Sequence, residues 1–330
     1  AAMKPGKITA ALCAGLVLVL GCSPASVERS YVAQAIDSLH HYSLHQARLD
    51  KDSLLRAALE DLTDTSTRAH SHAILRELVR SIDRHSDLFS PGQVRGELEP
   101  LTKNTDLYPF QHRLLDGDIA LIRVDGFMQG DSLSCGLFAD SLQRAVLALH
   151  ERAPIGWIVD LRANTGGNLY PMLAGLGPLL GCGDLGWNVD ASGLKQAWWY
   201  CRDDDEPEGS SHITLVREPV VFNDTPPVVV LVGQHTGSAG EALALSFVGR
   251  SRTCSFGART AGYASGNRMV FLPDSALLNV TCAWMMDRSG RTHPHGMIPD
   301  SLFEREEDAF RAAEEFLLTW RERSSRIACN

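Results

Sequence analysis

From residue 114 onward, apolar positions alternate between short continuous runs and longer periodic stretches. The run at 228–232 is β-branched and follows two prolines, so it predicts a buried strand, whereas 239–247 is rich in helix formers and predicts a helix. The same pattern predicts a hairpin at 114–124, helices at 139–150 and 170–182, a buried strand running from 155 into a glycine turn by 168, and strands at 252–257 and 276–287. Strands that alternate with helices indicate an α/β protein.

The first third of the chain has a different pattern. Residues 27 to about 90 are predicted to be helical, and 72–85 places apolar residues at helical spacing on one face. The sequence SPGQ at 90–93 ends that helix. Residues 184–218 look irregular and polar, and the end of the chain predicts an amphipathic helix.

The N-terminus resembles the export signal of a bacterial lipoprotein. Lys4 and Lys7 precede an apolar stretch at 8–21, which is short for a membrane span, and the stretch ends in VLGC with Cys22 as the expected lipidated residue. The alternative is an ordinary secretory signal with an incidental cysteine; either predicts export. We therefore expect a signal at 1–22, a helical module and linker at 23–105, and the α/β core at 106–330.

Composition narrows the classes of function. The chain has 330 residues, 44% of them hydrophobic and 22% charged, as in an ordinary globular protein. Its net charge of −9 and pI of about 5.7 argue against nucleic acid as the main partner. The eight cysteines have no zinc or CxxC spacing, so we expect no metal and no cofactor. Export would permit disulfides, and Cys182 with Cys201 is one possible pair.

The candidate chemistry centres on Ser238, which lies in a Gly-flanked turn between the predicted strand and helix. Free backbone N–H groups at a helix start can stabilise an oxyanion, but serine is also a common helix cap. A second glycine turn, at Gly166 and Gly167, also follows a predicted strand. If the two turns are neighbours in the sheet, an N–H of that turn and the N–H of Ala239 would point at one oxyanion.

Several segments, taken in order, resemble the C-terminal-processing, or tail-specific, serine peptidases. They are WIVDLRANTGGNLYPMLAGLGPLLG (157–181), TGSAGEALALSFVGR (236–250), FGARTAGYASGN (256–267), LPDSALLNVT (272–281) and DRSGRTHPHGMIPD (287–300). IDRHSDLFSP (82–91) resembles the histidine motif of the branch that includes the tricorn core and the retinoid-binding-protein-like domains. The resemblance implies a ClpP/crotonase-like core preceded by the helical module. The 91–113 linker is too short to hold the PDZ domain that many relatives carry.

The resemblance also assigns catalytic roles. It makes Ser238 the nucleophile and places Tyr263 where one branch has a lysine base. Because a tyrosine pKa near 10 makes a poor base at neutral pH, it favours the other branch, whose base is the upstream histidine, here His85. Its ordinary pKa near 6.5 suits proton removal from a serine.

The group that orients His85 stays open at the level of sequence. Relatives have a glutamate shortly before the GxxPD segment, where this chain has His293 or His295. Other candidates for orienting or supporting roles are Asp83, Ser86 and Asp87 beside His85, together with Glu241 and Tyr263.

These observations favour an exported, lipid-anchored serine peptidase that acts on peptides or proteins and is held at the bacterial membrane. A non-catalytic binder of a peptide or apolar ligand on the same fold is the alternative. An α/β-hydrolase esterase is a third possibility, but the residue two before the serine is Thr236 rather than the glycine of a nucleophile elbow. The sequence predicts no oligomeric state.

Overall fold

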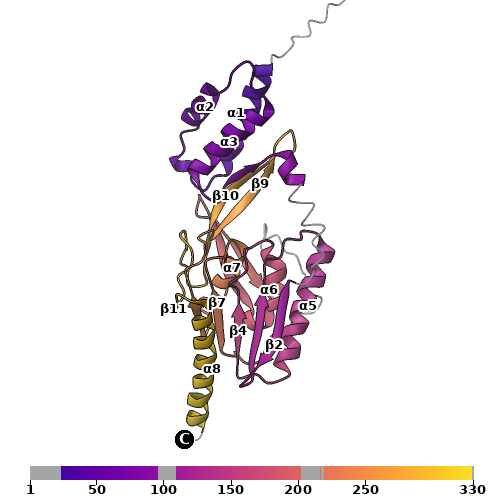
Figure 1. Cartoon of the computed structure of the whole chain (residues 1–330), viewed down its shortest axis with the longest axis vertical. Coiled ribbons are helices and arrows are strands. Elements are labelled where there is room, and N and C mark those ends of the chain that lie inside the picture. The colour runs from indigo at the N-terminus through magenta and orange to yellow at the C-terminus, as the bar shows by residue number, and fades with distance from the viewer. Residues whose placement is uncertain (1–23, 96–108, 202–215, 217–218, 329–330) are drawn as a thin grey trace, which may run out of the picture.

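A computed structural model describes residues 24–95, 109–201, 216 and 219–328. The molecule is elongated, with a helical module at one end, an antiparallel sheet in the middle and an α/β core that carries the C-terminal helix at the other (Figure 1). This agrees with the α/β class and the helical N-terminal segment that the sequence predicts. The expected signal, with Cys22, lies outside the described residues.

The core is built on a six-stranded sheet with the order β11-β8-β7-β4-β3-β2. Its strands are β2 (Phe110–Leu115), β3 (Ile119–Val124), β4 (Gly156–Asp160), β7 (Val228–Val232), β8 (Thr253–Gly257) and β11 (Ser301–Leu302). All neighbours are parallel except β2, which pairs antiparallel with β3. The strands β4 and β7 are buried at every residue, as expected for parallel strands covered on both faces.

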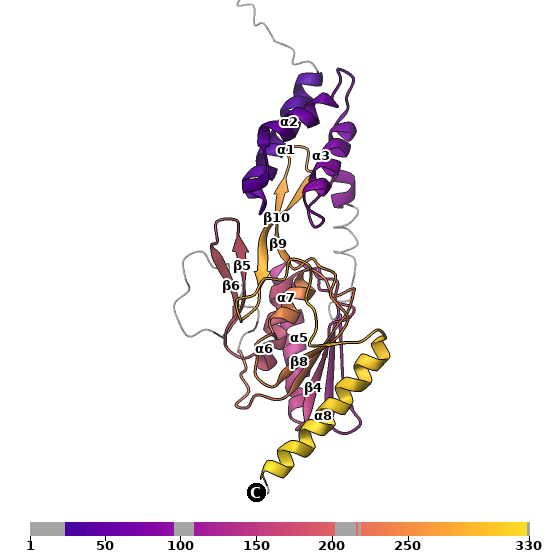
Figure 2. The same cartoon turned by 90° about the vertical axis from the view of Figure 1, so that its left-hand side faces the viewer.

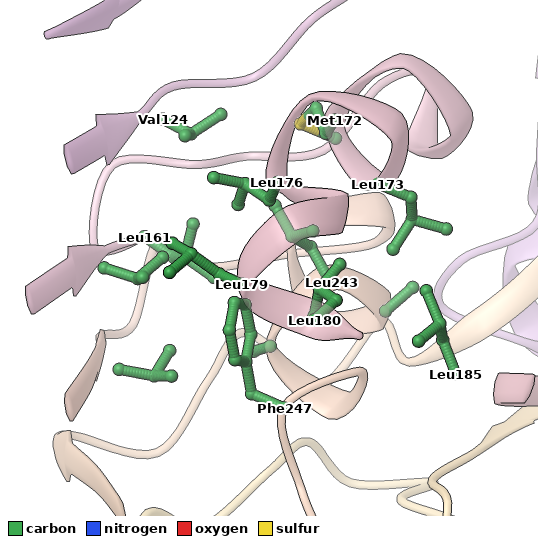
Figure 3. Close-up of a cluster of buried hydrophobic side chains, with 14 of the residues drawn as sticks. Val124, Leu161, Met172, Leu173, Leu176, Leu179, Leu180, Leu185, Leu243 and Phe247 are labelled. Atoms are coloured by element: carbon green, nitrogen blue, oxygen red, sulfur yellow. The ribbon is translucent and has the colours of Figure 1, made fainter. Parts of the chain in front are cut away.

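Helices cover both faces of this sheet. On one face lie α5 (Ser132–His150), α6 (Leu169–Leu180) and α7 (Ala239–Leu245), whose leucines pack with Val124, Leu161 and Phe247 in the main hydrophobic cluster (Figure 3). On the other face α8 (Glu306–Ala328) buries Ala309, Ala313 and Leu317 (Figure 2). The amphipathic C-terminal helix predicted from the sequence is therefore confirmed.

A second sheet connects the core to the helical module. Its strands are β1 (Asp87–Phe89), β5 (Gly183–Asp190), β6 (Lys195–Tyr200), β9 (Ser265–Phe271) and β10 (Leu277–Met286), in the order β1-β10-β5-β6 with β9 also on β10. Two predictions are wrong here. The segment 184–218 is not irregular throughout, because β5 and β6 form a hairpin, and the helical region ends at Ile82, before β1.

The helical module consists of α1 (Pro24–Tyr42), the short 3₁₀ helix η1 (Gln46–Arg48), α2 (Lys51–Glu60) and α3 (Arg68–Ile82). Its apolar core is completed by Leu272, Ala276, Leu278 and Val280 from the β9–β10 hairpin. The module thus shares its core with a distant part of the sequence, and this contact fixes the turn after α3, which carries His85. Within the described ranges no helix is both long enough and apolar enough to cross a membrane.

Candidate active site

Two glycine turns meet at one edge of the main sheet. Strands β4 and β7 are parallel neighbours, so the turns that follow them leave the sheet at the same edge. A Cβ atom built on Gly166 would lie 2.9 Å from the Ser238 Cβ and 2.9 Å from the Gly237 carbonyl oxygen. The closeness of this turn to Ser238, expected from the sequence, is confirmed, and any side chain at Gly166 would collide with the serine.

Asn164 holds the two turns together. Its backbone carbonyl accepts a hydrogen bond from the Gly237 N–H at 2.9 Å, and its Oδ1 accepts one from the Gly166 N–H at 3.0 Å. Asn164 is fully buried, so these contacts are protected from water. They also correct one expectation, because the Gly166 N–H is already engaged and is not available as an oxyanion donor. The candidate donors are therefore the amides of Gly167 and Ala239.

Ser238 has an unusual backbone conformation. It stands at the N-terminal cap of α7 with φ +52° and ψ −119°, whereas ordinary capping residues are extended. A non-glycine residue in this region is strained, and such strain persists where the surrounding structure enforces it, often at functional sites. The geometry thus favours more than a capping role for this serine.

Glu241 supplies the constraint on Ser238. Its carboxylate accepts hydrogen bonds from the N–H groups of Ser238 (3.1 Å), Gly262 (3.0 Å) and Tyr263 (2.7 Å) and from the Thr260 hydroxyl (2.5 Å). Burial raises the pKa of this carboxyl, although all four hydrogen bonds act in the opposite direction. Glu241 is therefore a supporting carboxylate that ties the start of α7 to the 260–263 loop.

His85 is held by a serine that the sequence analysis missed. The His85 Nδ1 lies 2.7 Å from the Oγ of Ser265, which is 3% exposed at the start of β9. If Nδ1 carries the proton and donates it to Ser265, Nε2 keeps its lone pair and can accept a proton. No local signal marks Ser265, because its position depends on β9 pairing with β10 and on β10 pairing with β1, near His85.

The residues beside His85 support its backbone rather than its ring. Asp83 Oδ1 accepts from the N–H groups of His85 (2.8 Å) and Ser86 (3.1 Å) and from the Thr281 hydroxyl (2.6 Å). The Ser86 hydroxyl in turn accepts from the Thr281 N–H. The sequence offered Asp83, Ser86 and Asp87 as groups that could orient the His85 ring. In the structure Asp83 and Ser86 anchor the turn to β10. Asp87 pairs with Arg80 at 2.6 Å.

Tyr263 connects the histidine side of the site to the serine side. Its ring centroid lies 4.9 Å from that of His85, while its N–H donates to Glu241, which also receives the Ser238 N–H. The guanidinium of Arg84 lies over the Tyr263 ring, 4.6 Å from its centroid. Among the hydrogen bonds of the described residues, none joins His85 directly to Ser238.

Burial lowers the pKa of His85 below its ordinary value, and Arg84 acts in the same direction while Asp83 opposes it. A base with a lowered pKa stays neutral, and so able to accept a proton, at more acidic pH. The imidazole faces no hydrogen-bonded carboxylate in the described structure, because its Nδ1 partner is a hydroxyl.

His293 lies outside this cluster. Its Nε2 is 2.8 Å from Oδ2 of the fully buried Asp287, whose other oxygen accepts from the Ser289 N–H and hydroxyl and the Arg291 N–H. His293 therefore stabilises the 287–293 turn and does not orient His85. Its neighbour His295 contributes a carbonyl to Arg259 at 3.3 Å. Across the described ranges, no three His, Cys, Asp or Glu side chains gather as a metal site requires.

A cavity of about 700 Å³ opens beside the His85–Ser265 pair. Its walls come from the helical module, the β5–β6 hairpin and strand β9, and include Tyr42, Tyr170, Gln196, Gly266 and Arg268. Gly266 directly follows Ser265. Asn267, also in the walls, donates to the His85 carbonyl at 3.2 Å, so this groove adjoins the backbone of the candidate base, although His85, Ser265 and Ser238 do not line it.

The sequence profile of peptidase family S41 matches residues 118–303, more than half of the chain. The chain belongs to peptidase family S41. The serine-peptidase family expected from the sequence motifs is therefore confirmed, and the matched region carries Ser238 and both glycine turns. His85, by contrast, lies before it.

Individual relatives agree with this assignment. The chain is 34% identical over 179 residues to the nisin-resistance protein of Lactococcus lactis, covering 54% of each protein, so it spans about half the length of this curated relative. It resembles the solved structure of a lipoprotein from Streptococcus agalactiae with a TM-score of 0.74 and 25% identity, over 88% of this chain and 96% of that one. The photosystem II D1 C-terminal processing protease shares the S41 fold, with a TM-score of 0.61 and 16% identity over 84% and 93% of the chains.

Proposed function

We propose that this S41 protein hydrolyses peptide bonds through an acyl-enzyme on Ser238, with His85 as general base. The observation that carries the proposal is the meeting of the two glycine turns around a strained serine at a helix start. That arrangement brings one hydroxyl to the start of a helix and beside a second turn, where free backbone amides can stabilise the oxyanion of acyl transfer. Membership of family S41 supports the reaction class, and the geometry around Ser238 and His85 supports the roles proposed for them.

The proposed reaction begins when His85 Nε2 takes the proton from the Ser238 hydroxyl, whose oxygen attacks the peptide carbonyl carbon. The carbonyl oxygen becomes negative and is stabilised by the amides of Ala239 and Gly167. Collapse of this intermediate breaks the C–N bond, and protonated His85 gives its proton to the leaving amine. A water molecule, deprotonated by His85, then releases the acyl group and restores Ser238.

The substrate is proposed to be a peptide in an extended conformation. The groove near Ser265 has a volume of about 700 Å³, and among the described strands β9 pairs only with β10, which leaves its other edge without a strand partner. An exposed strand edge can pair with an extended peptide. Since the curated relative is a nisin-resistance protein, nisin belongs among the first substrates to be tried.

A fluorophosphonate probe distinguishes a peptidase from the alternative, a binder on the same fold. Covalent labelling at Ser238, together with cleavage of some members of a peptide library, is the expected result because only an activated serine reacts with the probe. A protein that binds peptides without labelling or cleavage would instead be the binder.

Ser265 is proposed to position His85, and its removal should change the pH dependence. We expect Ser265→Ala to lower the rate of peptide cleavage roughly tenfold, as for loss of one orienting hydrogen bond, with little change in KM. In the wild type, the acidic limb of the kcat/KM profile should lie below pH 6.5, because burial lowers the pKa of His85. The profile should change shape in Ser265→Ala.

Ser265→Thr is the matched control, since it keeps the hydroxyl next to His85. Its rate and pH profile should stay near those of the wild type, apart from any effect of the added methyl group on packing. Equal losses in both variants, with an unchanged pH profile, would mean that Ser265 acts only in packing.

We further propose that the protein is exported and anchored through a lipid on Cys22. The VLGC sequence after a short apolar stretch supports this, and the similar streptococcal structure is described as a lipoprotein. Cys22→Ser should move the protein from the membrane fraction of its host to the soluble fraction. An intact mass from host membranes that shows an unmodified Cys22, or cleavage elsewhere, would contradict this prediction.

A further inference from the structure

A cysteine flanks each end of the β5–β6 hairpin. The first cross-strand pair of its antiparallel ladder is Gly183 with Tyr200. The residues directly outside this pair are Cys182 and Cys201, at the base of the hairpin. Residues opposite each other in an antiparallel ladder have Cα atoms about 4.5–5.5 Å apart, which lies within the range that a disulfide spans.

A second observation concerns the neighbouring Tyr200. Burial raises the pKa of the Tyr200 phenol, and the negative charges that Cys201 and Cys182 carry as thiolates each add to that increase. Both groups must lie near one phenol to do so, because Coulomb effects fall with distance. The Tyr200 hydroxyl is itself fixed by hydrogen bonds to Gln143 and to the Val220 carbonyl.

The chain leaves the extended strand conformation at the base of the hairpin. Cys201 has φ +51°, a conformation uncommon for residues other than glycine, while Gly181 and Gly183 on either side of Cys182 also have positive φ. Cys182 is exposed and Cys201 half-buried, so an oxidant can reach the first thiol and the second can attack it. The other described cysteines, Cys135, Cys254 and Cys282, lie on α5, β8 and β10 with no cysteine opposite them.

From this geometry we propose that Cys182 and Cys201 form a disulfide in the exported protein. The two thiols lose two protons and two electrons and form one S–S bond, while the disulfide of a protein oxidant in the extracytoplasmic compartment takes up both electrons and both protons and becomes a dithiol. The bond closes the base of a hairpin whose residues Asn188, Asp190 and Gln196 line the groove beside the active site. It therefore fixes one wall of the proposed substrate groove. The proposal rests on export, but not on peptidase activity.

Mass spectrometry of protein purified from the host envelope tests the bond directly. Lys195 lies between the two cysteines, so trypsin separates them into two peptides that remain joined only by a disulfide. After thiol blocking and digestion without reductant, we expect one linked pair, lighter by two hydrogens than the sum of the two peptides, which reductant separates. Recovery of both peptides with blocked thiols would overturn the proposal.

Thermal unfolding gives an independent readout. A cross-link stabilises the protein mainly by restricting the unfolded chain, so Cys182→Ser, Cys201→Ser and the double variant should each lower Tm by roughly 5–10 °C without reductant. With reductant, the wild type should fall to the level of the variants. Cys254→Ser is the control and should keep the reductant-sensitive step. A wild-type Tm that does not respond to reductant would contradict the bond, whereas Ser238 labelling reports separately on the proposed activity.

Discussion

Ser238→Ala and His85→Ala should each lower the rate of peptide cleavage by about a thousandfold or more, the scale seen when a nucleophile or its base is removed. Both substitutions remove a participant in the same proton transfer. The double variant should therefore be scarcely slower than either single one, since residues that act as a unit are not additive. Fluorophosphonate labelling should disappear in Ser238→Ala and become much slower in His85→Ala.

Tyr263→Phe is the control for this experiment. It keeps the ring that lies 4.9 Å from His85 and the N–H that donates to Glu241, and it removes only the phenolic hydroxyl. Its rate should therefore fall far less than that of His85→Ala. Strong loss in Tyr263→Phe together with retained activity in His85→Ala would overturn the assignment of the base. Folding of all variants is checked by circular dichroism before their rates are compared.

The sequence predicts the centre of the fold well and its edges poorly. Strands β4 and β7 are buried at every residue, and their continuous apolar runs allow few other interpretations. Strands β6 and β9 carry exposed polar residues and, in β9, the exposed Met269 and Phe271, so no apolar alternation marks them. Pairing with β5 and β10 stabilises these strands, and such long-range contacts are not visible in a local pattern.

The same distinction applies to the active site. The turns at Gly166 and Ser238 follow apolar strands, so their meeting could be predicted from parallel-sheet topology. The engagement of the Gly166 N–H by Asn164 could not, because it depends on how one buried side chain turns back toward its own loop. Nor could the Ser265–His85 contact, which joins residues 180 positions apart through two pairings of β10.

Glu241→Ala should have the largest effect on stability of any change at this site. Removing the carboxylate leaves the N–H groups of Ser238, Gly262 and Tyr263 without their acceptor, whereas the Thr260 hydroxyl can still turn toward the Met297 carbonyl. Unsatisfied buried donors cost about 1–3 kcal/mol each. Because their effects are not fully additive, we expect the free energy of unfolding to fall by about 3–5 kcal/mol in urea denaturation.

Activity should fall with stability, but for a separable reason. The Ser238 N–H contact to Glu241 holds the strained backbone of the nucleophile, so Ser238 labelling should slow even at a temperature where Glu241→Ala remains folded. Glu304→Ala, at an exposed position, is the control and should change neither quantity. An unfolding free energy within 1 kcal/mol of the wild type would show that water replaces the carboxylate at all three N–H groups. Normal labelling in the folded variant would show that the Ser238 conformation is set by the two glycine turns alone.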